Sequence, residues 1–194
     1  MWEERYAESE YAYGTEPNDF LKEQVTRVVP GRALCLAEGQ GRNAVFLASL
    51  GFDVTAVDLS PVGLHRAREL AAARGVSITT EVLDLAQLHL DAASWDLIVS
   101  IFAHVPPPVR AHAHGQVVRG LRAGGRFILE AYTPGQVARS TGGPRSPELT
   151  MTLQGLKSEL SGLHFDVARE LTREVIEGKY HTGLADVVQL SGVR

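Results

Sequence analysis

The chain has 194 residues, with 19 Lys or Arg and 23 Asp or Glu, which gives a formal net charge of −4 at pH 7. That length predicts one domain, and a hydrophobic share of 44% excludes an intrinsically disordered chain. The acidic balance argues against a general affinity for nucleic acid or anionic lipid. The single cysteine, Cys35, excludes an internal disulfide or a zinc site of several cysteines, and we expect a buried, inert thiol.

The sequence has no run of 18 apolar residues, so no transmembrane helix is expected. Residues 1–6 are polar and acidic, which is unlike a secretory signal. We therefore expect a cytoplasmic protein without a membrane partner.

Apolar runs typical of strands alternate with helical stretches over the first two thirds of the chain. Strands are expected at residues 33–37, 52–57, 76–83, 95–102 and 126–131, and helices at residues 43–50, 61–74 and 108–121. Ser60 is a suitable N-cap and Pro61 a suitable first residue for the second helix, and Gly75 marks its end. This alternation predicts βαβ units with right-handed crossovers in a parallel sheet.

The last third of the chain has a different pattern. A loop rich in Gly and Pro at 140–147 precedes a helical spacing of leucines over 147–160, and strand-like runs follow at 165–176 and 184–193. The segment between those runs is too short for a crossover helix, so they should form an antiparallel hairpin. The predicted fold class is α/β: a doubly wound, mostly parallel sheet with a C-terminal antiparallel hairpin.

A glycine turn follows the first predicted strand. Gly39-Gln-Gly41-Arg-Asn-Ala44 matches G-x-G-x-x-A, a pattern that places a cofactor at the start of a helix. Asp58 ends the second strand, nineteen residues after Gly39, where a carboxylate can accept from two ribose hydroxyls. NAD and S-adenosylmethionine both carry that ribose, so both remain candidates. The alternative for the glycines is an ordinary strand-to-helix turn.

Glu38, directly before this turn, separates the two cofactors. A carboxylate there would repel a pyrophosphate but attract the ammonium and sulfonium groups of S-adenosylmethionine. Asp84 follows the third strand, where an acid can accept from the adenine amino group, although it is equally suited to cap a helix. No tyrosine has a lysine four residues later, so the catalytic pair of short-chain reductases is missing.

Five motifs occur in an order that resembles the class I S-adenosylmethionine-dependent methyltransferases. They lie at residues 37–41, 57–60, 83–85, 95–100 and 121–126. The C-terminal hairpin agrees with the seven-stranded sheet of that family. Residues 2–6 and 13–18 resemble the small tellurite-resistance and thiopurine-methyltransferase-like branch. The chain departs from the common pattern by having Glu38 where Asp is commoner and Arg42 where a third glycine is usual.

By this resemblance, the glycine turn should hold the methionine part of the cofactor. Asp58 should hold the ribose with Leu59 against the adenine, and Asp84 should hold the adenine edge. Ser100 and Ile101, at the end of the fourth strand, should face the reactive sulfur. The cofactor-binding candidates are Glu38, Gly39, Gly41, Asp58, Leu59, Ser60, Asp84, Leu85, Ser100 and Ile101.

The resemblance implies methyl transfer to a small-molecule acceptor, but it leaves the acceptor open among thiols, thiopurines, tellurite and other metabolites. Soft nucleophiles need alignment and little else, whereas alcohols and amines need a positioned base. His104, just after the fourth strand, and His181, in the hairpin, are the candidate catalytic residues; the alternative for each is packing or capping. Val105 interrupts the Asn/Asp-Pro-Pro motif of enzymes that methylate nucleic-acid amines, so no nucleic-acid partner is expected.

The N-terminal segment is rich in aromatic and acidic residues, including Trp2, Tyr6, Tyr11 and Tyr13. We expect residues 1–194 to form one domain in which residues 1–30 are a lid or helical segment. The alternative is that these rings simply dock the segment on the sheet.

Further pocket candidates are Arg42, Tyr132 and Arg145, which are equally suited to be solvated arginines and a packed tyrosine. His112 and His114 point to different faces of a helix, so no metal site is expected. The competing functions are a nicotinamide-dependent oxidoreductase and a non-catalytic protein that binds the same cofactor. The oligomeric state cannot be read from this pattern.

Overall fold

A computed structural model describes residues 6, 10–139 and 141–194 of the chain. Its strands are β1 (Arg32–Leu36), β2 (Asp53–Asp58), β3 (Thr79–Val82), β4 (Trp95–Ile101), β5 (Leu121–Tyr132), β6 (His164–Glu177) and β7 (His181–Val193). Its α-helices are α2 (Asp19–Val25), α3 (Arg42–Ser49), α4 (Pro61–Ala73), α5 (Pro107–Gly120) and α6 (Leu153–Glu159).

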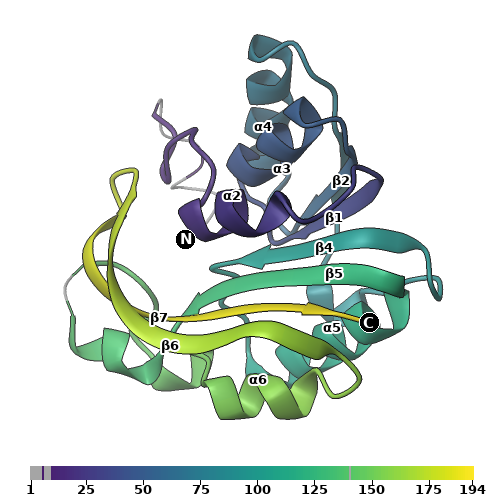
Figure 1. The fold of residues 1–194 in the computed structure, drawn as a ribbon. Coiled ribbons are helices and arrows are strands. Elements are labelled where there is room, and N and C mark those ends of the chain that lie inside the picture. Colours follow the sequence, from purple (N-terminus) through teal and green to yellow (C-terminus); the bar gives the residue numbers. More distant parts are fainter. Residues whose placement is uncertain (1–5, 7–9, 140) are drawn as a thin grey trace.

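The seven strands form one sheet in the order β3-β2-β1-β4-β5-β7-β6 (Figure 1). β1 to β5 pair in parallel, whereas β7 is antiparallel both to β5 and to β6. The later strand of the hairpin is therefore inserted between β5 and β6. This arrangement confirms the predicted fold class.

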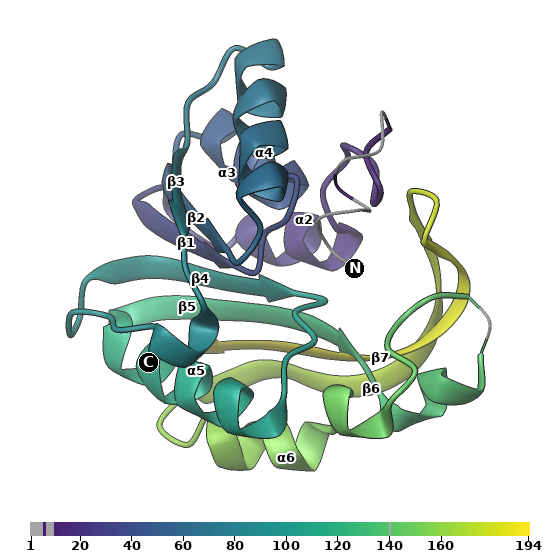
Figure 2. The same cartoon turned by 180° about the vertical axis from the view of Figure 1, so that it is seen from behind.

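Helices cover both faces of the sheet, as Figures 1 and 2 show, with α2, α3 and α4 on one face and α5 and α6 on the other. β1 illustrates how one strand serves both layers: Ala33 and Cys35 belong to the first core, and Leu34 and Leu36 to the second. Near-continuous apolar strands are expected for a sheet buried on both sides. Cys35 is fully buried in this core, and burial raises the pKa of its thiol well above its usual value.

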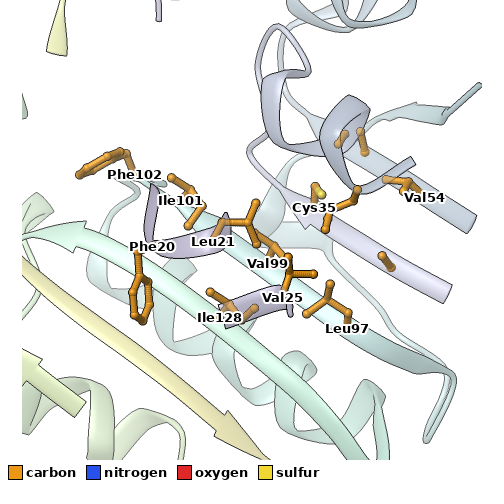
Figure 3. Close-up of a cluster of buried hydrophobic side chains, with 14 of the residues drawn as sticks. Phe20, Leu21, Val25, Cys35, Val54, Leu97, Val99, Ile101, Phe102 and Ile128 are labelled. Atoms are coloured by element: carbon orange, nitrogen blue, oxygen red, sulfur yellow. The ribbon is translucent and has the colours of Figure 1, made fainter. Parts of the chain in front are cut away.

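α2 lies within the predicted N-terminal helical segment. Asn18 caps it by accepting a hydrogen bond from the backbone N–H of Leu21. Phe20, Leu21 and Val25 then pack against β4 and β5 (Figure 3). The segment is thus tied to the sheet by apolar contacts as well as by a cap. The predicted role of Trp2 in a lid lies outside the described residues.

Several predicted elements differ in their bounds from those observed: β3 spans only Thr79–Val82, β7 begins at His181, and two others differ more in structure. The predicted helix over 147–160 is broken into a 3₁₀ turn at Pro147–Leu149 and α6, because Thr152 caps α6 and the N–H of Met151 donates to the carbonyl of Tyr132. β5 begins directly after α5, at Leu121 rather than at residue 126, with a register irregularity against β4 near its start.

Among the residues that the structure describes, no helix has the length and apolar character needed to span a membrane.

Candidate functional site

The glycine turn lies at the carboxyl end of β1 and leads into α3. Gly39 and Gly41 have φ angles of 63° and 89°, which residues with a Cβ rarely adopt. A Cβ on Gly41 would also lie 2.5 Å from the Cβ of Ala67, so α3 and α4 can approach only because that side chain is absent. The glycines are therefore required by the backbone, as the G-x-G pattern predicts.

Glu38 caps the N-terminus of α3. Its Oε1 accepts hydrogen bonds from the N–H groups of Asn43 and Ala44, both at 2.9 Å. Burial raises the pKa of this carboxyl to about 7, despite these two bonds and nearby Arg42. Near neutral pH the carboxyl is therefore only partly ionised, and a cation beside it would favour its ionised form.

Asp58, at the end of β2, organises the same turn. Its Oδ2 accepts from the N–H of Gly39 at 2.8 Å, and its Oδ1 accepts from the N–H of Ser60 at 2.8 Å. Ser60 in turn caps α4 by accepting from the N–H of Gly63. Leu59 between them is 65% exposed, so it presents an apolar side chain at the surface beside the turn.

The other four candidates lie farther along the same edge of the sheet. Asp84 accepts from the N–H of Ala86 and caps a short 3₁₀ helix, which is the alternative role considered above. Leu85 and Ile101 are buried, and Ser100 faces α5, where it lines a small cavity beside His114. These placements leave a role in cofactor binding as a prediction.

The residues of the turn fit a cationic cofactor better than an anionic one. Two carboxylates flank it, the half-buried Glu38 and the buried Asp58, and the charge of Asp58 adds to the rise in the pKa of Glu38. A ligand with ammonium and sulfonium groups would relieve that repulsion, whereas a pyrophosphate would increase it. Tyr6 lies against the same surface, because a Cβ on Gly39 would be 2.6 Å from the Tyr6 hydroxyl.

An aromatic cluster lies at the carboxyl ends of β4 and β5. It consists of Tyr13, Phe102, His104, Tyr132 and His181, from the N-terminal segment, the β4–α5 loop, β5 and the β6–β7 hairpin. Tyr132 is its centre, with ring centroids 4.5 Å from Phe102, 5.3 Å from His104 and 5.3 Å from His181. The two predicted catalytic histidines are thus brought to one tyrosine.

Phe102 reaches the cluster through an unusual backbone conformation. Its φ is 52°, and its N–H donates to the carbonyl of Glu130 on β5 at 2.8 Å. A bulky residue in the left-handed region is strained, and such strain concentrates at functional sites.

His104 is held in one tautomer. Its Nδ1 lies 3.1 Å from the carbonyl oxygen of Leu149, which can only accept, so Nδ1 carries the proton. Burial lowers the pKa of the ring to about 4, so it is neutral at physiological pH. Its Nε2 is therefore a lone-pair acceptor, buried and without a hydrogen-bond partner among the described residues.

Tyr132 carries a second unpartnered group. Its side chain is fully buried, and its hydroxyl has no hydrogen-bond partner among the described residues. Burial, then the charges of Glu177 and Glu130, raise its pKa well above the usual value, so the hydroxyl stays protonated and can donate. Tyr132 was one of the pocket candidates, whereas Arg145, another, is exposed.

A buried polar network, not predicted from the sequence, borders the aromatic cluster. Arg173 donates to both carboxylate oxygens of Glu130, at 2.7 and 2.8 Å, and Arg42 donates to Glu177 at 2.5 Å. The side-chain amide of Asn18 bridges the two carboxylates, at 2.6 and 2.8 Å. The network therefore joins α2 and α3 to the hairpin. A charged residue inside an apolar strand, as Glu130 is, was the available signal.

The residues considered for a metal have separate partners. The Nε2 of His112 lies 2.8 Å from the carbonyl oxygen of Leu88, and the Nδ1 of His114 lies 2.6 Å from Glu159. Within the part of the chain that the structure describes, no group of three or more His, Cys, Asp or Glu side chains is placed to hold a metal ion.

The glycine turn lies within a segment of the chain that matches a known family model. Residues 33–125 match the family model described as a methyltransferase domain. The chain also shares its fold with solved structures. A protein studied for the conversion of a disulfide bond into a thioacetal group during echinomycin biosynthesis has a TM-score of 0.78 at 20% identity, over 99% of this chain and 87% of that one.

Two further solved structures extend this likeness. TehB from Haemophilus influenzae has a TM-score of 0.73 at 19% identity, over 90% of this chain and 61% of that one. The N-methyltransferase NodS from Bradyrhizobium japonicum has a TM-score of 0.68 at 15% identity, over 90% of this chain and 92% of that one. These likenesses show that the chain has the fold of S-adenosylmethionine-dependent methyltransferases, a fold that it shares with TehB.

Curated relatives match only part of their length. "Hemagglutinin 1" of Eikenella corrodens is 35% identical over 71 residues, which is 37% of this chain and 24% of that protein. A Mycobacterium bovis protein is 30% identical over 103 residues, which is 53% of this chain and 38% of that protein. The chain thus spans well under half the length of these relatives.

Proposed function

We propose that the chain, whose residues 33–125 match the methyltransferase domain model, transfers a methyl group from S-adenosylmethionine to a small-molecule acceptor. The observation that carries this proposal is that two groups of candidate residues lie at the same edge of the sheet. The glycine turn follows β1 and Asp58 ends β2, and the aromatic cluster lies at the carboxyl ends of β4 and β5. In open α/β sheets, ligands bind outside the carboxyl ends of the strands.

The chain's own residues have distinct parts in this proposal. Glu38 and the glycine turn would hold the methionine part of the cofactor, Asp58 the ribose, and Asp84 with Leu85 the adenine. The cofactor supplies an activated methyl group. The protein positions the acceptor against it and excludes water, and alignment alone contributes about 7–11 kcal/mol to lowering the barrier.

The acceptor would lie in the aromatic cluster, with His104 and His181 as the candidate catalytic residues. Soft nucleophiles such as thiols, thiopurines and tellurite are the acceptors that the sequence resemblance suggests. A nicotinamide-dependent oxidoreductase is disfavoured by the two carboxylates at the glycine turn. A non-catalytic protein that binds the cofactor remains the second candidate, favoured by the tight packing of Tyr6 against Gly39.

Calorimetric titration tests the cofactor assignment. We expect S-adenosylhomocysteine to bind to the native protein and NAD not to bind. Asp58→Asn removes the charge while keeping the shape and should weaken binding at least tenfold. Asp53→Asn, at the exposed start of the same strand, is the matched control and should leave the dissociation constant unchanged. Binding of NAD in place of S-adenosylhomocysteine would refute the proposal.

A further inference from the structure

The β6–β7 hairpin extends beyond the strand on which it docks. β5 ends at Tyr132, which pairs with Val187, whereas β6 and β7 continue to pair with each other as far as Glu177 and His181. Residues 173–185 therefore form a two-stranded ribbon past the end of β5, which we call the flap. Figures 1 and 2 show this ribbon curving away from the sheet toward the N-terminal segment.

The flap is packed on its inner face. Val175 and Ala185 are buried in the core on the α2 side of the sheet, whereas Ile176 and Leu184, on the opposite face, are 74% and 55% exposed. A two-stranded ribbon is marginally stable by itself. The closed position of the flap therefore depends on the segments that meet its inner face and its tip.

A buried ion pair is one of these attachments. Arg42 donates to Oε2 of Glu177 at 2.5 Å, and the two side chains are only 9% and 5% exposed. The side-chain amide of Asn18 donates to the other oxygen of Glu177 at 2.8 Å. Arg42 is the first residue of α3 and directly follows Gly41. Separating buried charges is costly, so this ion pair ties the flap to the glycine turn.

A contact between two glycines is the second attachment. Gly14 ends a turn in which its N–H donates to the carbonyl of Tyr11, and Gly178 lies at the tip of the flap. A Cβ on Gly178 would lie 2.5 Å from the backbone nitrogen of Gly14 and 2.6 Å from Cα of Tyr13. The two backbones can therefore meet only because Gly178 has no side chain. Beside this contact, the ring of Tyr13 lies with its centroid 4.4 Å from that of His181.

The base of the flap is fixed more firmly than its tip. The carbonyl of Asp186 accepts from the N–H of Thr133, and its carboxylate accepts from Arg139 at 2.6 Å. Farther along the flap, the loop after β5 contributes a hydrogen bond at the surface, from the hydroxyl of Thr141 to the carbonyl of Leu184. Water can replace such a bond. Asp186 is therefore the natural hinge.

In the closed position the flap helps to cover the aromatic cluster. Tyr132 is fully buried, and its ring centroid lies 4.5 Å from that of Phe102 and 5.3 Å from that of His181. A small molecule can reach Tyr132 only if a neighbouring ring moves. Tyr132 is part of β5, and the N–H of Phe102 is bonded to the carbonyl of Glu130, so both are held by the sheet. His181, on the flap, is the ring that can leave.

We propose that residues 173–185 move away from the sheet to admit the acceptor, and that the Arg42–Glu177 ion pair and the Gly14–Gly178 contact hold them closed during methyl transfer. This inference rests on the proposed function. Opening breaks these local contacts and leaves the core intact, as in other hinge motions. Closure excludes water from the acceptor. Because Arg42 follows the glycine turn, the ion pair also connects the flap to the residues that would hold the cofactor.

Chemical modification of His181 measures opening of the flap. Diethyl pyrocarbonate acylates the imidazoles that solvent reaches, and mass spectrometry locates the products. In the same molecule, His65, whose side chain is 64% exposed, is the reference for full access, and the buried His114 reports global unfolding. Gly178→Ala adds a Cβ that separates the flap from Gly14. Gly75→Ala is the matched control, since Gly75 has the same φ of 68° and no atom within 4 Å of its added Cβ.

We expect His181 to be modified about tenfold faster or more in Gly178→Ala than in the native protein, with His114 unchanged. Glu177→Gln removes the charge that Arg42 pairs with and should accelerate modification of His181 by about threefold or more. Gly75→Ala should leave the rate unchanged. An unchanged rate at His181 in both flap variants, or an equal rise at His114, would overturn the inference, because the flap would then move only with the whole fold.

Calorimetry with S-adenosylhomocysteine separates the flap from the proposed function. Binding of this product to a native protein whose flap variants show no selective change at His181 sinks the flap alone. A selective rise at His181 in a protein that does not bind S-adenosylhomocysteine sinks the proposed function, and with it entry of a methyl acceptor as the purpose of the motion.

Discussion

Replacing Tyr132 by Phe should stabilise the protein. The side chain is fully buried, and its hydroxyl has no hydrogen-bond partner among the described residues, so folding removes the hydroxyl from water without compensation. Leaving such a group unsatisfied costs about 1–3 kcal/mol. The ring contacts with Phe102, His104 and His181 are all retained in the variant. We therefore expect the free energy of unfolding to rise by about 1–2 kcal/mol.

Urea denaturation of the ligand-free protein, followed by circular dichroism and fluorescence, measures this change. The slope against urea should stay constant, so that a shifted midpoint reports stability alone. Tyr11→Phe removes a hydroxyl that does have a partner, the carbonyl of Arg66, and should lower stability by about 0.5–1 kcal/mol. A loss of more than about 0.5 kcal/mol in Tyr132→Phe would show that the hydroxyl has a hydrogen-bond partner, and it would refute the reasoning that its burial is uncompensated.

Three further predictions concern the glycine turn and the contact of Glu159 on α6 with His114 and Arg110 on α5. The pKa of Glu38 is about 7, and the ammonium group of S-adenosylhomocysteine favours the charged form of this carboxyl. The dissociation constant of S-adenosylhomocysteine should therefore fall about tenfold from pH 6 to pH 8. Calorimetry should find that this pH dependence is absent in Glu38→Gln. Gly41→Ala should lower the free energy of unfolding by more than about 2 kcal/mol in chemical denaturation, because it adds a clash with Ala67 to the strain of a positive φ. Gly75 has a φ of 68° and open space around it, so Gly75→Ala should lower the free energy of unfolding by only about 1 kcal/mol. Equal losses in the two variants would contradict the clash. Burial acts to raise the pKa of Glu159, but hydrogen bonds from His114 and Arg110 outweigh it and lower the pKa to about 2. This carboxylate should therefore contribute about 2–3 kcal/mol to the free energy of unfolding above pH 5, and that contribution should be lost as the pH falls toward 2. A flatter acid-denaturation profile in Glu159→Gln would verify this, and an unchanged profile would refute it.

Local signals predicted the structure of the glycine turn and its neighbours well. Ser60 caps α4 as its position before Pro61 indicates, and the spacing of Gly39 and Asp58 does bring them together, at 2.8 Å. Both depend on a strand, a turn and a helix that are consecutive in the chain. Consecutive elements are usually neighbours in space, so a short stretch of sequence contains the information.

The aromatic cluster was harder to predict because it is assembled from distant segments. Tyr132 meets His181 only because β7 returns between β5 and β6, and the pairing register of a long hairpin follows from tertiary packing. The bond from His104 to Leu149 depends on the break before α6, where the leucine spacing predicted a continuous helix. The ion pair of Glu130 and Arg173 was hidden because charge within an apolar strand does not reveal its partner.

The position of β7 has a consequence for the order of folding. β6 precedes β7 in the chain but contacts the rest of the sheet only through it. The open edge of β5 therefore stays unpaired until β7 has been synthesised, and β6 has no earlier neighbour within the sheet. The natural sequence of events is that β6 and β7 first form a local hairpin, which then docks as a unit on β5. The Tyr132–His181 contact forms only when the hairpin docks on β5, so we expect this contact to report that docking step.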